Sequence, residues 1–125
     1  GQAKDRLVVY HCTSGYPVPF NECCMLQLTR LKELYGDRIK ALAFSGHHKG
    51  IAIDNAAVAL GATWVERHFT LDRTLRGTDH AASLEPAGLA KLVRDLNATF
   101  ETLTFKPDQM MDIERVQRDK LKYSG

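Results

Sequence analysis

The 125-residue sequence contains no long apolar run and only three cysteines. No apolar stretch approaches the ~20 residues that a helix needs to cross a bilayer, so we expect no membrane contact. The first residues also lack the basic-then-apolar order of a secretory signal. Cys12, Cys23 and Cys24 show no CxxC spacing, which disfavours a disulfide framework and a zinc knuckle. We therefore expect a protein of the reducing cytoplasm.

A strong excess of charge of either sign is also missing. The formal net charge is +2, too small to predict a basic stripe for nucleic acid, although the last stretch, "ERVQRDKLKYSG", is locally basic. We expect that stretch to be a solvated surface. Hydrophobic residues make up 44% of the sequence, which is enough for one ordinary core.

Three strand-then-helix units follow one another along the sequence. Runs of β-branched, aromatic and apolar residues predict strands over 6–13, 38–47 and 63–71. Helical spacing of apolar residues predicts a helix after each strand, with Gly61 ending the second helix. Parallel neighbours need such crossover helices, so the sequence predicts a parallel α/β sheet. An open doubly wound sheet and a piece of a (βα) barrel both fit.

The ends of the helices carry recognisable signals. Asn21 is predicted to cap the first helix and Gly36 to stop it in a left-handed conformation. Pro86 begins the last helix, because its fixed φ suits the first turn. The predicted apolar stripe of the last helix comprises Leu89, Val93, Leu96, Phe100 and Leu103. Pro107 ends this pattern, and residues 107–125 are expected to form a helical or irregular tail.

Histidines follow two of the predicted strands, and ligands bind at the carboxyl ends of parallel strands. Alternation places Ala41, Ala43, Ser45 and His47 on one face of the second strand, and His48 on the other. His68 ends the third strand, so His47 and His68 can approach one metal ion that keeps open positions for substrate. Each histidine could equally be a hydrogen-bonded core residue.

Two carboxylates accompany these histidines, each with more than one interpretation. Glu66 lies on the same predicted face as His68 and can orient a ligand, bind the metal or pair with an arginine. Asp79 lies in a long polar loop, where it can accept hydrogen bonds from sugar hydroxyls or cap the next helix. Cys12 and His11 point to opposite faces, which argues against a thiol nucleophile.

Three longer stretches resemble a known family. "YHCTSGYPVPF", "FSGHHKGIAIDNAAVALGATWVERHFTLD" and "GTDHAASLEPAGLAKLV" are similar, in order and spacing, to signature stretches of the sialic acid synthase family, the N-acetylneuraminate synthases. The resemblance covers roughly residues 7–96. It implies a TIM-type barrel that condenses phosphoenolpyruvate with an N-acetylmannosamine-type sugar. The expected products are phosphate and a nine-carbon 2-keto acid, a sialic acid.

The resemblance also implies roles for individual residues. His47 and His68 match the ligands of a divalent metal, manganese or magnesium. Ser45 matches a residue that helps to hold phosphoenolpyruvate, Tyr16 and Asp79 match sugar-contacting positions, and Glu66 falls near the metal. We expect catalytic roles for Ser45 and Glu66. Ser14 stands where some members use asparagine to bind phosphoenolpyruvate.

The length of the chain limits what these residues can do alone. A whole barrel takes about 250 residues and eight βα units, and residues 1–106 match the last three. The lysines, glutamate and glutamine that the family supplies from earlier strands are missing. We therefore expect an inactive segment that needs the other part of the barrel or further copies of itself. A non-catalytic module that self-associates is the alternative, and a metal-dependent aldolase of the same fold fits less well.

Overall fold

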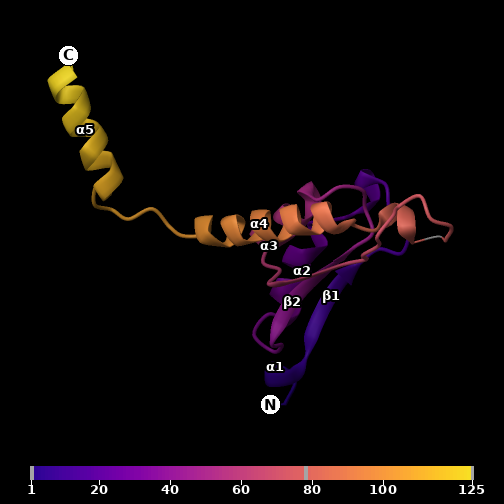
Figure 1. Ribbon diagram of the computed structural model, residues 1–125. Helices are drawn as coiled ribbons and strands as arrows, with labels where there is room; N and C mark the ends of the chain where they lie inside the picture. Colours follow the sequence, from indigo (N-terminus) through magenta and orange to yellow (C-terminus); the bar gives the residue numbers. More distant parts are fainter. Residues whose placement is uncertain (1, 78, 125) are drawn as a thin grey trace.

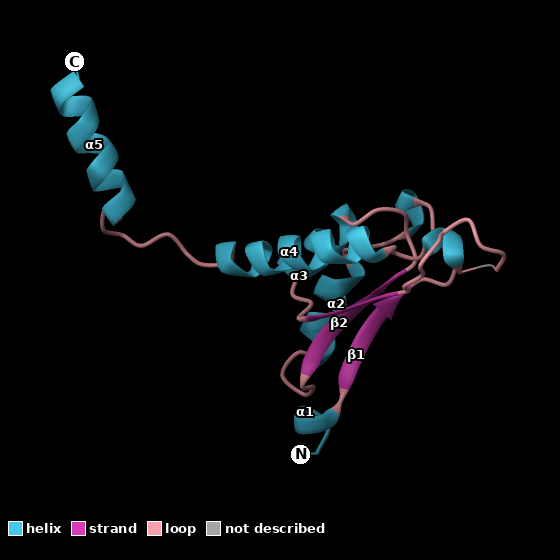
Figure 2. Ribbon diagram, in the orientation of Figure 1, coloured by secondary structure: helices cyan, strands magenta, loops and turns pink. Residues whose placement is uncertain are grey.

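The computed structural model describes residues 2–77 and 79–124, whose centre is a three-stranded parallel sheet. The strands are β1 (Val8–Cys12), β2 (Ala41–Gly46) and β3 (Trp64–Arg67). They pair in the order β1-β2-β3, and the observed strands are shorter than the predicted ones. In Figure 2, β1 and β2 run side by side toward the same end of the sheet. The predicted parallel α/β arrangement is confirmed.

Helices connect and flank these strands. They are α1 (Gln2–Arg6), α2 (Gln27–Tyr35), α3 (Ala52–Ala59), α4 (Pro86–Thr102) and α5 (Asp112–Ser124). Short 3-10 turns lie at Phe20–Glu22 (η1) and His80–Ala82 (η2). In Figure 1, α5 stands away from the sheet at the end of an extended segment. Among the described residues, no helix combines the length and apolar character needed to span a bilayer.

The core lies between β2 and the helices α2 and α3. As the central strand, β2 is covered on its helix side, where Leu42 and Phe44 are 6% and 3% exposed. Leu28 of α2, Ala57 of α3 and Ala62 complete this cluster. Alternation turns Ala41, Ala43 and Ser45 to the other face of the sheet.

That second face carries two exposed aromatic side chains. Tyr10 and Trp64 pair in register with Ala43 from either side. Their side chains are 40% and 47% exposed, so the described residues leave both rings open to solvent. A parallel sheet normally has both faces covered.

The first predicted helix is wrong at both ends. Asn21 lies in η1 instead of capping a helix, and α2 begins only at Gln27 because Cys24 adopts a φ of +50° that breaks the chain direction. Gly36 ends α2 with a right-handed φ of −54°, not a left-handed one. Gly61 does follow the end of α3 as predicted, with a positive φ of +115°.

The apolar stripe predicted for α4 is also wrong in most positions. Leu89, Val93, Phe100 and Leu103 are exposed, whereas Leu92 is 3% exposed. The predicted stripe fails because α4 packs on α3 with a different side, the one that carries Leu92 and Thr99. Pro86 begins this helix as expected.

Candidate functional site

His47 and His68 lie at equivalent places in the fold, each directly after a strand. The Val18 N–H donates to the His47 carbonyl at 2.9 Å, and the Leu84 N–H donates to the His68 carbonyl at 2.8 Å. The loops that follow β1 and β3 therefore fix the backbone of both histidines. Because β2 and β3 are parallel neighbours, the two side chains lie at the same end of the sheet.

The two imidazole rings lie next to each other. Their centres are 4.9 Å apart and their planes are nearly perpendicular, at 82°. Two imidazoles that each bind one ion through a nitrogen at about 2.1 Å, with ligand angles of about 90–110°, place their ring centres roughly 4.5–5.3 Å apart. The observed separation therefore fits two ligands of one metal ion.

Each ring has one nitrogen engaged with an oxygen atom. His47 Nδ1 is 2.9 Å from the Thr13 carbonyl, to which it can donate only as an N–H. His68 Nδ1 is 3.5 Å from Asp79 Oδ2. Metal-binding histidines commonly use one nitrogen for such a carbonyl or carboxylate and the other for the metal. Within the described residues no group of three or more His, Cys, Asp or Glu side chains forms a metal site, so this chain offers the pair alone.

Tyr16 brings an aromatic ring to the same place. Its ring centre is 4.7 Å from that of His47 and 5.8 Å from that of His68. The side chain is 42% exposed, which leaves part of the ring free to contact a ligand. Ser14, two residues earlier in the same loop, is exposed.

A row of polar side chains crosses the sheet just before the histidines. Cys12, Ser45 and Glu66 are paired in register on β1, β2 and β3 and therefore share one face. Ser45 is 7% exposed, whereas Glu66 is exposed. The arginine beside Glu66 in the sequence, Arg67, forms its ion pair with Asp54.

The loop after β3 places Asp79 beside His68. Asp72 accepts hydrogen bonds from the Thr74 hydroxyl and backbone N–H, at 2.7 and 2.8 Å, and these bonds lower the pKa of Asp72 below its ordinary value. Ser83 Oγ donates to the Asp79 carbonyl at 2.6 Å. Asp79 precedes η2, yet its side chain makes no capping hydrogen bond there.

Cys12 has a histidine neighbour that sequence reasoning missed. His11 does point away from it, toward the helix side, where its Nε2 lies 2.7 Å from the Cys23 carbonyl. Cys12 Sγ instead lies 3.8 Å from His47 Nδ1, across the gap between β1 and β2. Register pairing could have found this contact, because both residues follow the same alternation on neighbouring strands.

A buried charged cluster behind the sheet was also missed. Asp54 Oδ2 lies 2.7 Å from Arg67 Nη1 and 3.2 Å from His48 Nε2, and His48 and Asp54 are fully buried. His48 Nδ1, Asp54 Oδ1 and Arg67 Nε have no hydrogen-bond partner among the described residues. The sequence held a signal, since Arg67 lies on the helix-facing side of β3 and Asp54 lies among the apolar residues of α3.

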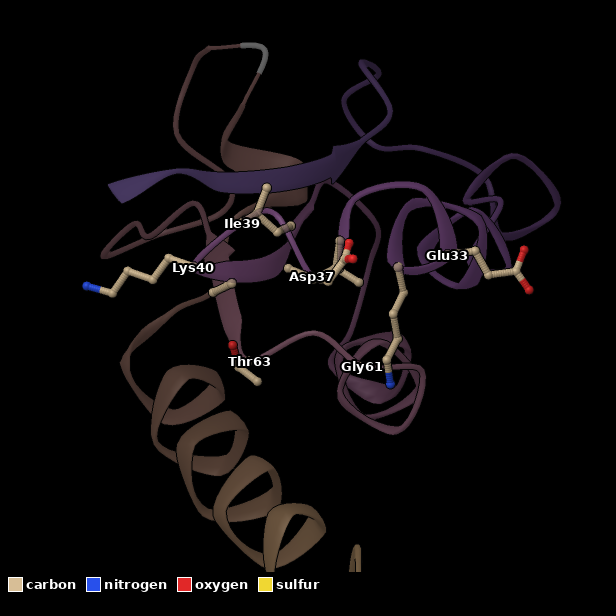
Figure 3. A pocket seen from close by; sticks show the side chains of 10 residues that line it. Glu33, Asp37, Ile39, Lys40, Gly61 and Thr63 are labelled. Atoms are coloured by element: carbon tan, nitrogen blue, oxygen red, sulfur yellow. The ribbon is translucent and has the colours of Figure 1, made fainter. Parts of the chain in front are cut away.

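A further cavity lies at the opposite end of the strands. It has a volume of about 540 Å³ and is lined by the end of α2, the start of β2 and Thr63. In Figure 3, the side chains of Lys40 and Glu33 extend away from each other instead of meeting in the cavity. Ligands of parallel sheets bind at the carboxyl ends of the strands, so we place the candidate site at His47 and His68.

Comparison with known proteins identifies the family. The sequence model of the NeuB family matches residues 1–107. The chain belongs to the NeuB family. Among the curated relatives, N-acetylneuraminate-9-phosphate synthase of Mus musculus is 42% identical over 110 residues, which are 88% of this chain and 30% of that protein. N,N'-diacetyllegionaminic acid synthase of Campylobacter jejuni is 44% identical over 74% of this chain and 27% of its own length.

Solved structures of similar proteins agree with the NeuB assignment. The N-acetylneuraminic acid (sialic acid) synthetase of Leptospira borgpetersenii, solved with citrate, aligns with a TM-score of 0.74 and 34% identity. The alignment covers 93% of this chain and 39% of that one. The spore coat polysaccharide biosynthesis protein SpsE of Bacillus subtilis aligns with a TM-score of 0.72. The chain thus spans about 30% of the length of the curated NeuB relatives.

Proposed function

We propose that this chain forms the metal-binding wall of a synthase that condenses phosphoenolpyruvate with an N-acetylmannosamine-type sugar. The products are phosphate and a nine-carbon 2-keto acid. The observation that carries the proposal is the pair of imidazole rings, 4.9 Å apart at the ends of neighbouring parallel strands. Relatives named as synthases of N-acetylneuraminate 9-phosphate and of N,N'-diacetyllegionaminic acid support the class of reaction.

His47 and His68 would hold a divalent metal, manganese or magnesium, through the ring nitrogens that face away from Thr13 and Asp79. When bound, such an ion supplies Lewis-acid polarisation of the sugar aldehyde. Thr13 and Asp79 keep the two rings in the tautomer and orientation that a ligand needs.

Other side chains at the site would bind the two substrates. The Ser45 hydroxyl can donate to an oxygen of phosphoenolpyruvate, and Ser14 lies on the adjoining loop. The exposed part of the Tyr16 ring offers a flat surface to the sugar, and Asp79, with its side chain 48% exposed, can accept a hydrogen bond from a sugar hydroxyl. The reaction also consumes one water molecule, which is needed to release the phosphate. Glu66 shares a face with Ser45 and can exchange a proton with this water.

Metal binding by the chain itself tests the histidine pair. We expect Mn²⁺ to bind the unmodified chain. Binding is measured as the loss of the electron paramagnetic resonance signal of free Mn²⁺. Binding should be lost in His47→Ala and His68→Ala. The matched control is His80→Gln, since His80 contacts Thr70 instead of the pair. Equal Mn²⁺ binding by all four proteins would contradict the proposal.

We further propose that the complete reaction requires barrel units that this chain does not contain. The whole active site would be a TIM-type barrel, of which these βα units are the last three. We expect no phosphate release from phosphoenolpyruvate by the 125-residue chain with manganese and N-acetylmannosamine. Measurable turnover would overturn this part of the proposal. We propose that the reaction is cytoplasmic and has neither nucleic acid nor a membrane as partner.

The exposed aromatic face favours one alternative, a module that associates with itself. Tyr10 and Trp64 could pack against a second copy as well as against the remainder of a barrel. Sedimentation velocity with and without Mn²⁺ distinguishes the synthase segment from the self-associating module. A stable oligomer that releases no phosphate and binds no Mn²⁺ would favour the module.

A further inference from the structure

We propose that Arg67 is a positioning residue that fixes the separation of His47 and His68. Arg67 touches neither imidazole of this pair, because its side chain projects to the opposite face of the sheet. It acts through the backbone of the loops that carry the site. The inference deepens the proposed function and rests on it.

Arg67 binds both loops at the carboxyl end of the sheet. Its Nη1 donates to the Gly50 carbonyl at 2.7 Å, and its Nη2 donates to the His48 carbonyl at 2.8 Å. Nη2 also lies 3.4 Å from the Ala82 carbonyl. The first two acceptors lie three residues and one residue after His47, and the third belongs to the loop that carries Asp79. One guanidinium, attached to the residue before His68, therefore links β3 to the segment that begins at His47.

The guanidinium is itself held in place. Its side chain is 2% exposed and pairs with the fully buried Asp54 at 2.7 Å. Gly46 provides the space, since a Cβ at this position would lie 2.9 Å from Arg67 Cδ and 2.8 Å from His48 Cε1. A buried ion pair with further hydrogen bonds is costly to break, because removing one partner leaves an uncompensated charge.

Only arginine suits this position. Its planar guanidinium presents five donors in a fixed fork, so it can bind a carboxylate and several carbonyls at once. Lysine would keep the charge next to Asp54 but offers a single nitrogen. Arg67→Lys should therefore preserve the ion pair and lose the link between the loops.

The first measurement follows the rings without any metal. With ring-labelled histidines, we expect a nuclear Overhauser effect between the His47 and His68 rings in the unmodified chain, given their separation of 4.9 Å. The signal should fall by at least half in Arg67→Lys. Arg73→Lys is the matched control, because Arg73 forms a half-exposed pair with Glu85 and should leave the signal unchanged.

A second pair of variants separates the effect of the hydrogen bonds between Arg67 and the carbonyls from the effect of its ion pair with Asp54. Asp54→Asn lowers stability by leaving the Arg67 charge unpaired, but it keeps a side-chain oxygen beside Arg67 and leaves the Gly50 and His48 carbonyls as acceptors, so the ring signal should persist in the folded protein. The double variant Asp54→Asn/Arg67→Gln removes the guanidinium without leaving a lone buried charge, and the signal should be lost. This comparison stays informative if Arg67→Lys fails to fold.

Cobalt(II) alone provides the second readout. We expect Arg67→Lys to weaken Co²⁺ binding about tenfold, the effect typical of residues that orient metal ligands. An unchanged ring signal in Arg67→Lys and in the double variant, or an equal loss in Asp54→Asn, would overturn the role of Arg67. Absence of Co²⁺ binding by the unmodified chain would instead contradict the metal site, while the metal-free ring signal still decides the role of Arg67.

Discussion

The carboxylate of Asp79 lies 3.5 Å from Nδ1 of His68, which leaves Nε2 as the other nitrogen of this ring. Asp79→Asn removes the negative charge and keeps the size of the side chain. We expect this change to weaken Mn²⁺ binding by about 10-fold to 100-fold, because outer partners of ligating histidines contribute affinity of this order. Titration with Mn²⁺ measures the effect.

Asp37→Asn is the control for this prediction. Asp37 is exposed and lines the cavity at the opposite end of the strands. Its substitution removes the same charge from the protein at a distance from the site. If both variants weaken Mn²⁺ binding equally, the effect is one of net charge and the assigned role of Asp79 is wrong.

Leu28 anchors α2 in the core and is fully buried. Leu28→Ala should lower the free energy of unfolding by about 2–5 kcal/mol, because it removes buried methyl groups and leaves a cavity. Urea denaturation followed by circular dichroism measures the change. Leu26→Ala, at a position 73% exposed, should change the free energy little, and a comparable loss there would contradict this assignment of the core.

Gly46 and Gly88 should respond to alanine in opposite directions. A Cβ at Gly46 would lie within 2.9 Å of both His48 and Arg67, so overpacking should cost about 1–3 kcal/mol. A Cβ at Gly88, within α4, meets only Leu84 at 3.7 Å or more. Gly88→Ala should raise the unfolding free energy by up to about 1 kcal/mol, because alanine favours the helix. Thermal unfolding of Gly46→Ala and Gly88→Ala measures the change in melting temperature of each variant. Equal changes in the two variants would contradict the prediction.

Cys23 should be the least reactive thiol of the folded chain. Burial, with the neighbouring Cys24 and Asp54, raises the pKa of Cys23 above its ordinary value of 9.0, whereas Cys12 and Cys24 are exposed. Above pH 9.0 the Cys23 thiol therefore keeps its proton in the folded state and loses it in the unfolded chain. The contribution of Cys23 to the free energy of unfolding falls as the pH rises above 9.0. Iodoacetamide labelling at pH about 8, read by mass spectrometry, should modify Cys12 and Cys24 first. Faster labelling of Cys23 would refute this.

Local patterns predicted the sheet and the position of the histidines. The alternation of β2 placed Ser45 and His47 at the carboxyl end, and β-branched and aromatic residues marked each strand. His47 and His68 do lie beside each other, as the alignment of parallel strands requires. The pairing is specified by short-range periodicity together with one topological rule, so a single sequence suffices.

Long-range packing was not predictable in the same way. The amphipathic pattern of α4 identified a helix but not the side that faces α3, so Leu92 was overlooked. The buried cluster of His48, Asp54 and Arg67 depends on three elements meeting behind the sheet. Periodicity describes each element separately and carries no information on which buried charges will meet. The departure of α2 from its predicted start likewise arises at Cys24, a residue type that gives no turn signal.

The acceptors of Arg67 on the two loops are main-chain oxygens, which are present whatever side chains occupy positions 48, 50 and 82. The loop surface around the site can in this way diversify while the scaffold beneath it stays constant. Engineering of the ligand preference that we propose should accordingly begin with the loop side chains that point away from this anchor.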